Sequence, residues 1–441
     1  MYHFRKQFTS AQIILLSYAV LICIGCLLLM LPWAAQQGKA PFFDALFTAV
    51  SASCVTGLIV QDTATYWSFF GQAVILLLIQ IGGLGVITVA MLFTQLARKT
   101  ISLKQQSILQ DAITAPQVGD IIRLTGFVVK TTLFLELFGA ILLAPVFCSE
   151  FGMLQGIWYA LFHSVSAFCN AGFDLMGIYT PYASLTIFAD NAYVLSIIMC
   201  LIIIGGIGFL TWEDVRIHKH HIHRYTMQSK VILFCTVLLI ICPALYFFRF
   251  ELPGITFAER CLNALFQAIT ARTAGFNTID LTKWNDTGLL IMIFLMLIGG
   301  APGSTAGGMK TTTCAVLAST LLAVLRQKKD TQIFYRRIAE QTVRTAFSIA
   351  FLYFMLSAVS GAIISQIEQL PLLTCWFETA SALGTVGLSL GITCELTASS
   401  KCILIILMYI GRVGSLTLIF SAVSKKLTYH ATLPQENITI G

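Results

Sequence analysis

Apolar stretches of two lengths alternate along the chain, separated by polar connections. Eight of them come close to or exceed the roughly 20 residues that a membrane-crossing helix needs. These long stretches cover residues 12–32, 69–96, 126–147, 192–212, 231–248, 289–325, 345–364 and 402–424. We therefore expect eight membrane spans, the sixth of which contains an interruption.

Four shorter apolar stretches, at 41–54, 157–169, 261–271 and 372–383, lie between the two members of each successive pair of long ones. They are too short to cross a bilayer, and stretches of about 10–14 apolar residues are typical of re-entrant or buried helices. The order long, short, long occurs four times. It predicts an all-α polytopic membrane protein with eight spans and four re-entrant pore helices.

The four short stretches also share a residue pattern, which indicates an internal repeat. In each, a Phe precedes a polar residue, and Ser or Thr followed by Ala comes three positions after that polar residue. The polar residues are Thr48, His163, Gln267 and Glu378. Each pattern closes on a glycine followed by a large apolar residue, and these glycines are Gly57, Gly172, Gly275 and Gly387. We expect four pseudo-symmetric repeats, at residues 1–115, 116–222, 223–335 and 336–441.

The closing glycines suggest a purpose for the repeat. Glycine adopts backbone conformations that other residues rarely adopt, so it can turn carbonyl oxygens toward a shared axis. At membrane depth, non-helical backbone is tolerated only where it lines a water-filled cavity or is buried in protein. Four such loops around one central pore can form a ring of carbonyls that replaces the hydration shell of an ion, as in K⁺-selective filters. The candidate filter residues are Val55, Thr56, Gly57, Asn170, Ala171, Gly172, Thr273, Ala274, Gly275, Thr385, Val386 and Gly387.

Composition excludes a soluble protein and explains the net charge. Hydrophobic residues make up 57% of the chain and charged residues 11%, whereas soluble domains carry about 25% charged residues. The formal net charge of +7 is not a signal for nucleic-acid binding. Lys and Arg gather in the N-terminus, in the connections 98–123, 213–230 and 326–344, and in the C-terminal tail. By the positive-inside rule, both termini and these three connections are expected to be cytoplasmic.

The interruption of the sixth long stretch, at residues 299–313, reads GGAPGSTAGGMKTTT. It is a poor helix, because each glycine costs about 1 kcal/mol relative to alanine. A phosphate-binding loop needs Lys directly after its second glycine, and Met309 occupies that position. We expect an intramembrane gating loop, with simple close packing of small residues as the alternative. Its candidate gate residues are Gly299, Gly300, Gly303, Gly307, Gly308 and Lys310.

Arg412 lies within the last long stretch, between two glycines. A charged side chain at bilayer depth is a functional hypothesis by default. We expect Arg412 to constrict the pore and to pair with the gating loop. The alternative is a structural ion pair with Glu136 or Glu378 inside the helix bundle.

Together, the four loops, the glycine-rich interruption and Arg412 make the chain resemble the Trk/Ktr/HKT superfamily of K⁺ transporters, and most closely the membrane subunit of bacterial Ktr systems. The resemblance implies a K⁺-translocating membrane protein of the bacterial cytoplasmic membrane whose transport is stimulated by Na⁺. It also implies a homodimer that binds a cytosolic nucleotide-binding ring (KtrA-like). It implies no enzymatic activity, no covalently bound cofactor and no nucleic-acid partner.

Two other classes of protein were weighed against this interpretation. An alternating-access cation symporter also uses broken helices at midplane, but many such carriers have inverted repeats rather than a fourfold parallel one. A membrane-embedded enzyme needs acids, histidines or nucleophiles clustered at one depth, and the sequence suggests no such cluster.

Overall fold

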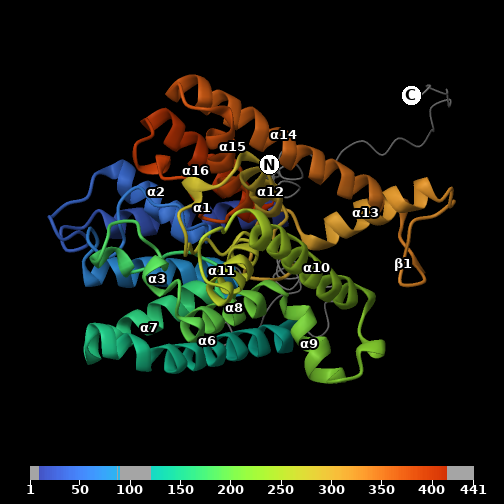
Figure 1. The fold of residues 1–441 in the computed structure, drawn as a ribbon, viewed down its shortest axis with the longest axis horizontal. Coiled ribbons are helices and arrows are strands. Elements are labelled where there is room, and N and C mark those ends of the chain that lie inside the picture. The colour runs from blue at the N-terminus through green and yellow to red at the C-terminus, as the bar shows by residue number, and fades with distance from the viewer. Residues whose placement is uncertain (1–8, 87, 90–120, 415–441) are drawn as a thin grey trace, which may run out of the picture.

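The computed structural model describes residues 9–86, 88–89 and 121–414 of the chain. Helices dominate this part, as the apolar pattern predicts (Figure 1). Four long helices open the four expected repeats: α1 (Ser10–Leu29), α6 (Ile121–Phe151), α10 (Met227–Phe250) and α14 (Glu340–Glu368). Within the described residues, each of these four is long and apolar enough to cross a bilayer, with the stretch Leu124–Phe151 meeting that test in α6.

A short helix follows each long one, at the position of each expected short stretch. These helices are α2 (Phe42–Ser53), α7 (Met153–Phe168), α11 (Phe257–Thr270) and α15 (Leu372–Gly384). Their first turns are encoded locally. Pro41 and Pro371 directly precede α2 and α15, at a helix end where the missing N–H of proline removes no helical hydrogen bond. Thr256 and Glu259 form a reciprocal capping box at the start of α11.

A third helix completes each repeat, and three of the four are shorter than the sequence suggested. The four third helices are α3 (Phe69–Leu84), α8 (Ala192–Gly206), α12 (Asp286–Leu297) and α16 (Ala398–Val413). Three of them end near a glycine with positive φ: Gly85 at 88°, Gly208 at 89° and Gly414 at 91°. The right-handed helix cannot continue through such a residue, so each long apolar run is interrupted there.

The span predicted at 192–212 is therefore not one straight helix. Gly208 separates α8 from α9 (Phe209–His218), and the two helices are bent by 96°. Even if α8 and α9 are counted as one broken span, the described residues contain no more than five helices or helix pairs that pass the test for crossing a membrane. The ends of the expected spans 69–96 and 402–424 lie partly outside the described residues.

The sixth long apolar stretch is interrupted by non-helical chain, as predicted, but this non-helical segment ends earlier than expected. The chain between α12 and α13 (Thr311–Leu325) is non-helical at residues 299–310. Thr311, Thr312 and Thr313, which were expected in the loop, form the first turn of α13.

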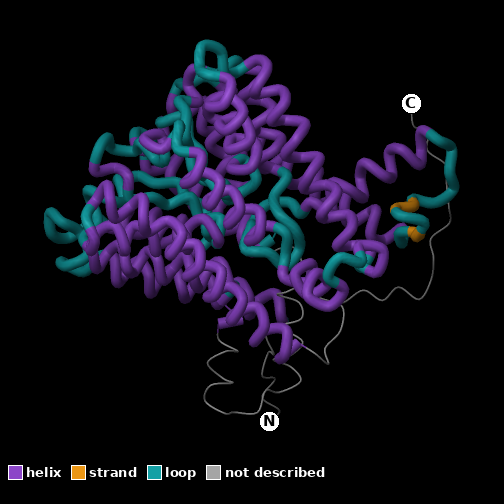
Figure 2. Tube along the Cα trace, turned by 60° about the horizontal axis from the view of Figure 1, so that its bottom comes forward, coloured by secondary structure: helices purple, strands orange, loops and turns teal. Residues whose placement is uncertain are grey.

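After α13, a small hairpin of β1 (Gln332–Ile333) and β2 (Arg336–Arg337) stands away from the main body (Figure 2). Short 3₁₀ turns occur at Met176–Ile178, Thr186–Phe188, Ile222–Arg224, Leu281–Lys283 and Ile392–Cys394.

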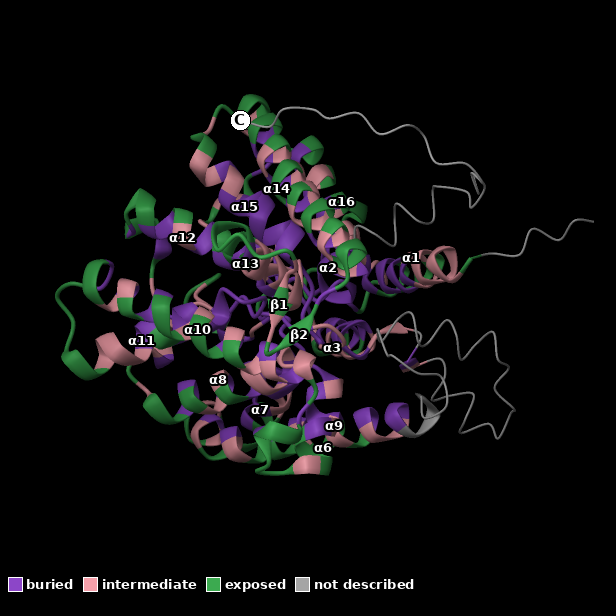
Figure 3. Cartoon of the chain, turned by 90° about the vertical axis from the view of Figure 1, so that its right-hand side faces the viewer, coloured by how far each residue is buried: buried purple, intermediate pink, exposed green. Residues whose placement is uncertain are grey.

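The core lies where the four short helices converge. Buried residues gather toward the middle of the molecule, whereas the outer helices expose apolar side chains (Figure 3). The first and last repeats are in contact, since the Tyr409 hydroxyl donates to the Leu15 carbonyl at 2.7 Å. The first and last repeats of the chain therefore lie side by side.

Candidate functional site

The loops that leave the four short helices meet one another in a closed cycle. A Cβ atom added to Gly57 would clash with the carbonyl oxygen of Ala171 in the next repeat. A Cβ atom on each of the other three glycines would likewise clash with a carbonyl oxygen of the next loop: Gly172 with Ala274, Gly275 with Val386, and Gly387 with Thr56 of the first loop. Each of the four predicted glycines is therefore packed against the peptide oxygen that precedes the next one.

The backbone of each loop alternates in handedness. Two positions before each glycine, a non-glycine residue has positive φ: Val55 at 57°, Asn170 at 57°, Thr273 at 74° and Thr385 at 51°. The glycines have positive φ as well: 90° at Gly57, 68° at Gly172, 84° at Gly275 and 95° at Gly387. Because alternating left- and right-handed residues turn successive peptide groups the same way, each loop presents its N–H groups on one side and its carbonyls on the other.

The N–H side of each loop is held by the helix before it. The Ser51 carbonyl accepts from Thr56 N at 2.8 Å, and its hydroxyl accepts from Gly57 N at 3.1 Å. Ser381 does the same for Val386 N at 2.8 Å and Gly387 N at 3.1 Å. Ser166 and Thr270, the matching residues of the other repeats, hold their loops through the same carbonyl and donate from their hydroxyls to Phe173 O and Phe276 O. The repeated Ser or Thr in the sequence is thus the residue that fixes the loop.

This use of the N–H groups decides what the ring can bind. Within the described residues, most loop donors are bonded to the short helices, whereas no hydrogen bond is made to the carbonyl oxygens of Thr56, Ala171, Ala274 and Val386. These oxygens remain for a ligand at the centre of the cycle. A ring of carbonyls matches the hydration shell of a monovalent cation. The short helices also end at the ring, so the partial negative charge of their C-termini favours a cation there.

The glycine-rich segment 299–310 packs against the break between α8 and α9. Ala301 N donates to Gly206 O at 2.9 Å, and Thr305 N donates to Gly205 O at 3.3 Å. In return, Phe209 N donates to Gly303 O at 2.7 Å. The segment therefore satisfies carbonyls that the end of α8 leaves without a helical partner.

The same segment reaches the ring of loops. Thr305 Oγ1 donates to the carbonyl of Phe168, the last residue of α7, at 3.0 Å. A Cβ on Gly307 would clash with the side chain of Thr385, one of the four positive-φ residues. Lys310 Nζ donates to Ala306 O at 2.8 Å, so its ammonium folds back onto the segment itself.

Arg412, at the end of α16, connects this segment to α3. Its Nη1 donates to Thr305 O, and its Nη2 donates to Gly82 O and Gly83 O. The expected contact between Arg412 and the glycine-rich segment is therefore present. The alternative, an ion pair with a glutamate, was wrong for this structure. Among the described residues, the hydrogen-bond partners of Arg412 are three backbone carbonyls and the hydroxyl of Tyr18.

The two buried glutamates have other partners. Glu136 on α6 accepts from Gln80 Nε2 at 3.0 Å and contacts Cys169, the residue after α7, at 3.7 Å. Glu378 on α15 accepts three hydrogen bonds from the chain that leaves the fourth loop. Glu136 thus links α3 of the first repeat to the second loop, whereas Glu378 bonds within the fourth repeat.

A further element of the site was missed in the sequence, although a signal for it exists. At or near the end of each third helix, Ile-Gly is followed shortly by another glycine, beginning at Ile81, Ile204, Ile298 and Ile410. In three repeats the first glycine packs on the carbonyl at the end of the short helix: Gly82 on Ser53, Gly205 on Phe168 and Gly411 on Leu383. The pattern marks where the third helix breaks and where it supports the loop.

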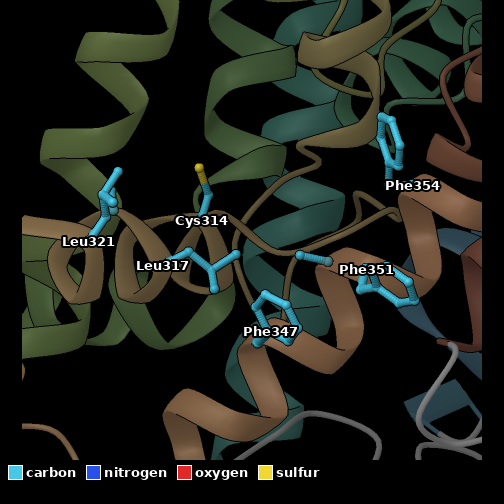
Figure 4. A pocket seen from close by; sticks show the side chains of 8 residues that line it. Cys314, Leu317, Leu321, Phe347, Phe351 and Phe354 are labelled. Atoms are coloured by element: carbon cyan, nitrogen blue, oxygen red, sulfur yellow. The ribbon is translucent and has the colours of Figure 1, made fainter. Parts of the chain in front are cut away.

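Among the described residues outside the ring, neither an acidic cluster nor an apolar groove offers a comparable site. In the described ranges, no group of three or more His, Cys, Asp or Glu side chains is placed to hold a metal ion. A groove of about 500 Å³ runs between α13 and α14 (Figure 4). Apolar and sulfur side chains line it, among them Cys314, Leu317, Leu321, Phe347, Phe351 and Phe354. Such a surface has no oxygen ligands for an ion.

Comparisons with known proteins cover nearly the whole chain. The family model TrkH, described as a cation transport protein, matches residues 5–429. The potassium/sodium uptake protein NtpJ of Enterococcus hirae is 39% identical over 449 residues, which is 99% of this chain and 98% of that protein. The Ktr system potassium uptake protein B of Bacillus subtilis is 37% identical over 421 residues, covering 94% of this chain and 93% of that protein. The crystal structure of the potassium transporter TrkH from Vibrio parahaemolyticus has the same fold, with a TM-score of 0.74 at 21% identity over 95% of this chain and 86% of that one.

Proposed function

The chain belongs to the TrkH family of cation transport proteins, and from this membership we propose that it is the K⁺-translocating membrane subunit of a Ktr/Trk-type K⁺ uptake system. It is a multi-pass membrane protein and not an enzyme. Two relatives that share more than a third of its residues are named as potassium or potassium/sodium uptake proteins. The transported cation is accordingly K⁺.

The cycle of four loops is the proposed selectivity filter. The observation that carries the proposal is the packing of each loop glycine against the carbonyl that precedes the next glycine. Eight spans and four re-entrant helices then surround one pore, with the repeats at 1–115, 116–222, 223–335 and 336–441. A partly dehydrated K⁺ ion exchanges water oxygens for these carbonyls. No bond is made or broken in the process.

The glycine-rich segment is the proposed gate. It contacts the C-terminus of α7 and Thr385, and Arg412 of the neighbouring fourth repeat holds it. Placed under the filter, this segment obstructs the ion path, and the guanidinium adds electrostatic repulsion. Gly299, Gly300, Gly303, Gly307, Gly308, Lys310 and Arg412 make up the proposed gate.

Family membership also suggests the membrane, the oligomeric state and the partner of the subunit. We assign it to the bacterial cytoplasmic membrane as a homodimer with both termini in the cytoplasm, where basic residues concentrate. Nucleotide control comes from a cytosolic KtrA-like ring, a partner suggested by the Ktr system to which one relative belongs. Na⁺ stimulates or couples to uptake, in line with a relative named for both ions.

The filter assignment is tested by adding a side chain to each loop glycine. Serine at Gly57, Gly172, Gly275 or Gly387 must displace the neighbouring carbonyl, so we expect the half-saturating K⁺ concentration to rise by about tenfold, equivalent to about 1.4 kcal/mol. Gly254 is the matched control, because it also has positive φ (88°) but has no neighbour within 4 Å of an added Cβ. Uptake is measured in a K⁺-auxotrophic host with and without Na⁺. Unchanged K⁺ kinetics in all four filter variants would contradict the proposal.

A further inference from the structure

In three of the four short helices, the polar residue that follows Phe contacts the chain on the far side of its loop. His163 Nε2 accepts from Leu175 N at 3.4 Å, while its Nδ1 lies 2.7 Å from Tyr159 O. Gln267 Nε2 donates to Asn277 Oδ1 at 2.9 Å and to Thr278 Oγ1 at 3.3 Å. Both contacts reach residues two or three positions after the loop glycine. These side chains therefore brace the segment that leaves the loop, here termed the exit segment.

Glu378 makes the strongest contact of this kind. Its Oε1 accepts from the Ser389 hydroxyl at 2.7 Å and from Leu390 N at 2.9 Å. Its Oε2 accepts from the Thr393 hydroxyl at 2.7 Å. The side chain is completely buried, and hydrogen bonds to a carboxylate are about twice as strong as neutral ones. Glu378 thus fixes the exit segment of the fourth loop at three points.

The first repeat has no equivalent brace. The hydroxyl of Thr48, at the matching position, is buried and has no hydrogen-bond partner in the described structure. The exit segment of this repeat instead meets that of the fourth, where Cys394 Sγ lies 3.6 Å from Ile59 O. Cys394 directly follows Thr393, which Glu378 holds. The carboxylate therefore supports two adjacent loops of the ring, its own and the unbraced first one.

We propose that Glu378 is a specificity-determining positioning residue, whose carboxylate sets the spacing of the fourth and first filter loops by holding the exit segment 389–393. The inference rests on the proposed filter function. Glu378 does not touch the ion. It limits how far the carbonyls of Val386 and Thr56 can move relative to each other, and this limit disfavours the inward shift that the smaller Na⁺ requires.

The test replaces Glu378 with glutamine, which keeps the shape but exchanges one acceptor oxygen for an NH₂ donor. We expect E378Q to reduce K⁺-over-Na⁺ discrimination by about tenfold, as loss of a charge-assisted hydrogen bond would predict. T393V and S389A remove the donors and leave the carboxylate in place, and they are expected to shift discrimination in the same direction. In a double-mutant cycle, E378Q and T393V should be non-additive, because they remove the same hydrogen bond.

Glu368 provides a matched control in the same repeat. Its Oε1 accepts from Thr397 N at 3.0 Å and from the Thr397 hydroxyl at 2.6 Å, away from the exit segments. We expect E368Q to keep normal ion discrimination. Discrimination is measured as competition between K⁺ and Na⁺ for uptake per molecule of folded protein, so that a loss of stability alone does not change it.

The outcomes separate this inference from the filter assignment. If G387S alters K⁺ kinetics while E378Q, T393V and S389A all retain wild-type discrimination, Glu378 is a purely structural residue and the inference fails alone. If E378Q does not fold, T393V and S389A decide the question in the same way. If all four glycine variants behave as wild type, both proposals are overturned.

Discussion

Arg412 donates a hydrogen bond from Nη1 to the backbone carbonyl of Thr305, 107 positions earlier in the chain. The same guanidinium reaches Gly82 and Gly83 at the end of α3 through Nη2. One side chain of the fourth repeat thus joins the glycine-rich segment of the third repeat to the broken helix of the first. Since the guanidinium is planar and carries five donors, it can make these contacts at once and hold the segment in position.

Replacing Arg412 by glutamine is expected to increase the rate of K⁺ uptake. A unit charge about 4 Å from the ion opposes it by about 4 kcal/mol at an effective dielectric constant of ~20, and loss of the bond to Thr305 releases the gate. We expect at least a tenfold higher maximal rate with unchanged K⁺-over-Na⁺ selection. The measurement is initial uptake per molecule of folded protein.

The R412K variant distinguishes the effect of the positive charge from the effect of the hydrogen-bond geometry. R412K keeps the positive charge but cannot contact Thr305 and Gly82 together, so we expect an intermediate uptake rate. If R412Q instead lowered both the uptake rate and the melting temperature, Arg412 would be a structural clamp and not part of a gate.

Shortening the glycine-rich segment should raise the maximal uptake rate and leave the half-saturating K⁺ concentration nearly unchanged. The reason is that the proposed barrier lies under the filter and limits passage, whereas the proposed filter carbonyls set K⁺ binding. A deletion within residues 303–308 removes the contact of Gly307 with Thr385. T305V is the milder companion variant, because it removes only the hydroxyl that donates to Phe168 O at 3.0 Å. A stably inserted deletion variant that transports no faster would favour a packing role.

The hydroxyls of Ser51 and Ser381 should be required for K⁺ affinity. Each accepts from the N–H of a loop glycine at 3.1 Å, and a buried donor left without a partner costs about 1–3 kcal/mol. We expect S51A and S381A each to raise the half-saturating K⁺ concentration several-fold. Ser348 is the control, because its hydroxyl donates to Arg344 O on an exposed face of α14. Equal behaviour of S348A and S381A would argue against the role of the hydroxyl.

Much of this architecture could be predicted from the sequence because its signals are local. The proline before α2 and the capping box before α11 mark where the short helices begin. The Phe-polar pattern and the closing glycines marked all four loops, since a residue with positive φ so close to other backbone has few substitutes for glycine.

The helix breaks and the partners of Arg412 could not be predicted in the same way. Apolar residues continue through Gly85 and Gly208, so hydropathy gives no sign that the helices stop there. The contact of Arg412 with the glycine-rich segment was expected, and the alternative was an ion pair with a carboxylate, which is the usual solution for a buried charge. That its acceptors would be backbone carbonyls of Thr305, Gly82 and Gly83 was not foreseen. The breaks themselves supply the acceptors, as helix ends expose carbonyls without helical partners. The positions of these acceptors depend on contacts between distant repeats.

Gly205 offers the sharpest test of how the third helices support the loops. A Cβ at this position would clash with Phe168 O and lie 3.0 Å from Thr305 Oγ1, so G205A presses on both the root of the second loop and the glycine-rich segment. Overpacking of this kind costs about 1–3 kcal/mol, and we expect a lower melting temperature together with a raised half-saturating K⁺ concentration. Gly126 in α6 is the matched control, because an added Cβ there meets nothing within 4 Å and alanine is the better helix former. G126A should therefore leave both quantities unchanged or raise the melting temperature slightly. A G205A variant that lost stability with normal K⁺ kinetics would show that the third helix supports the fold without setting the geometry of the loop.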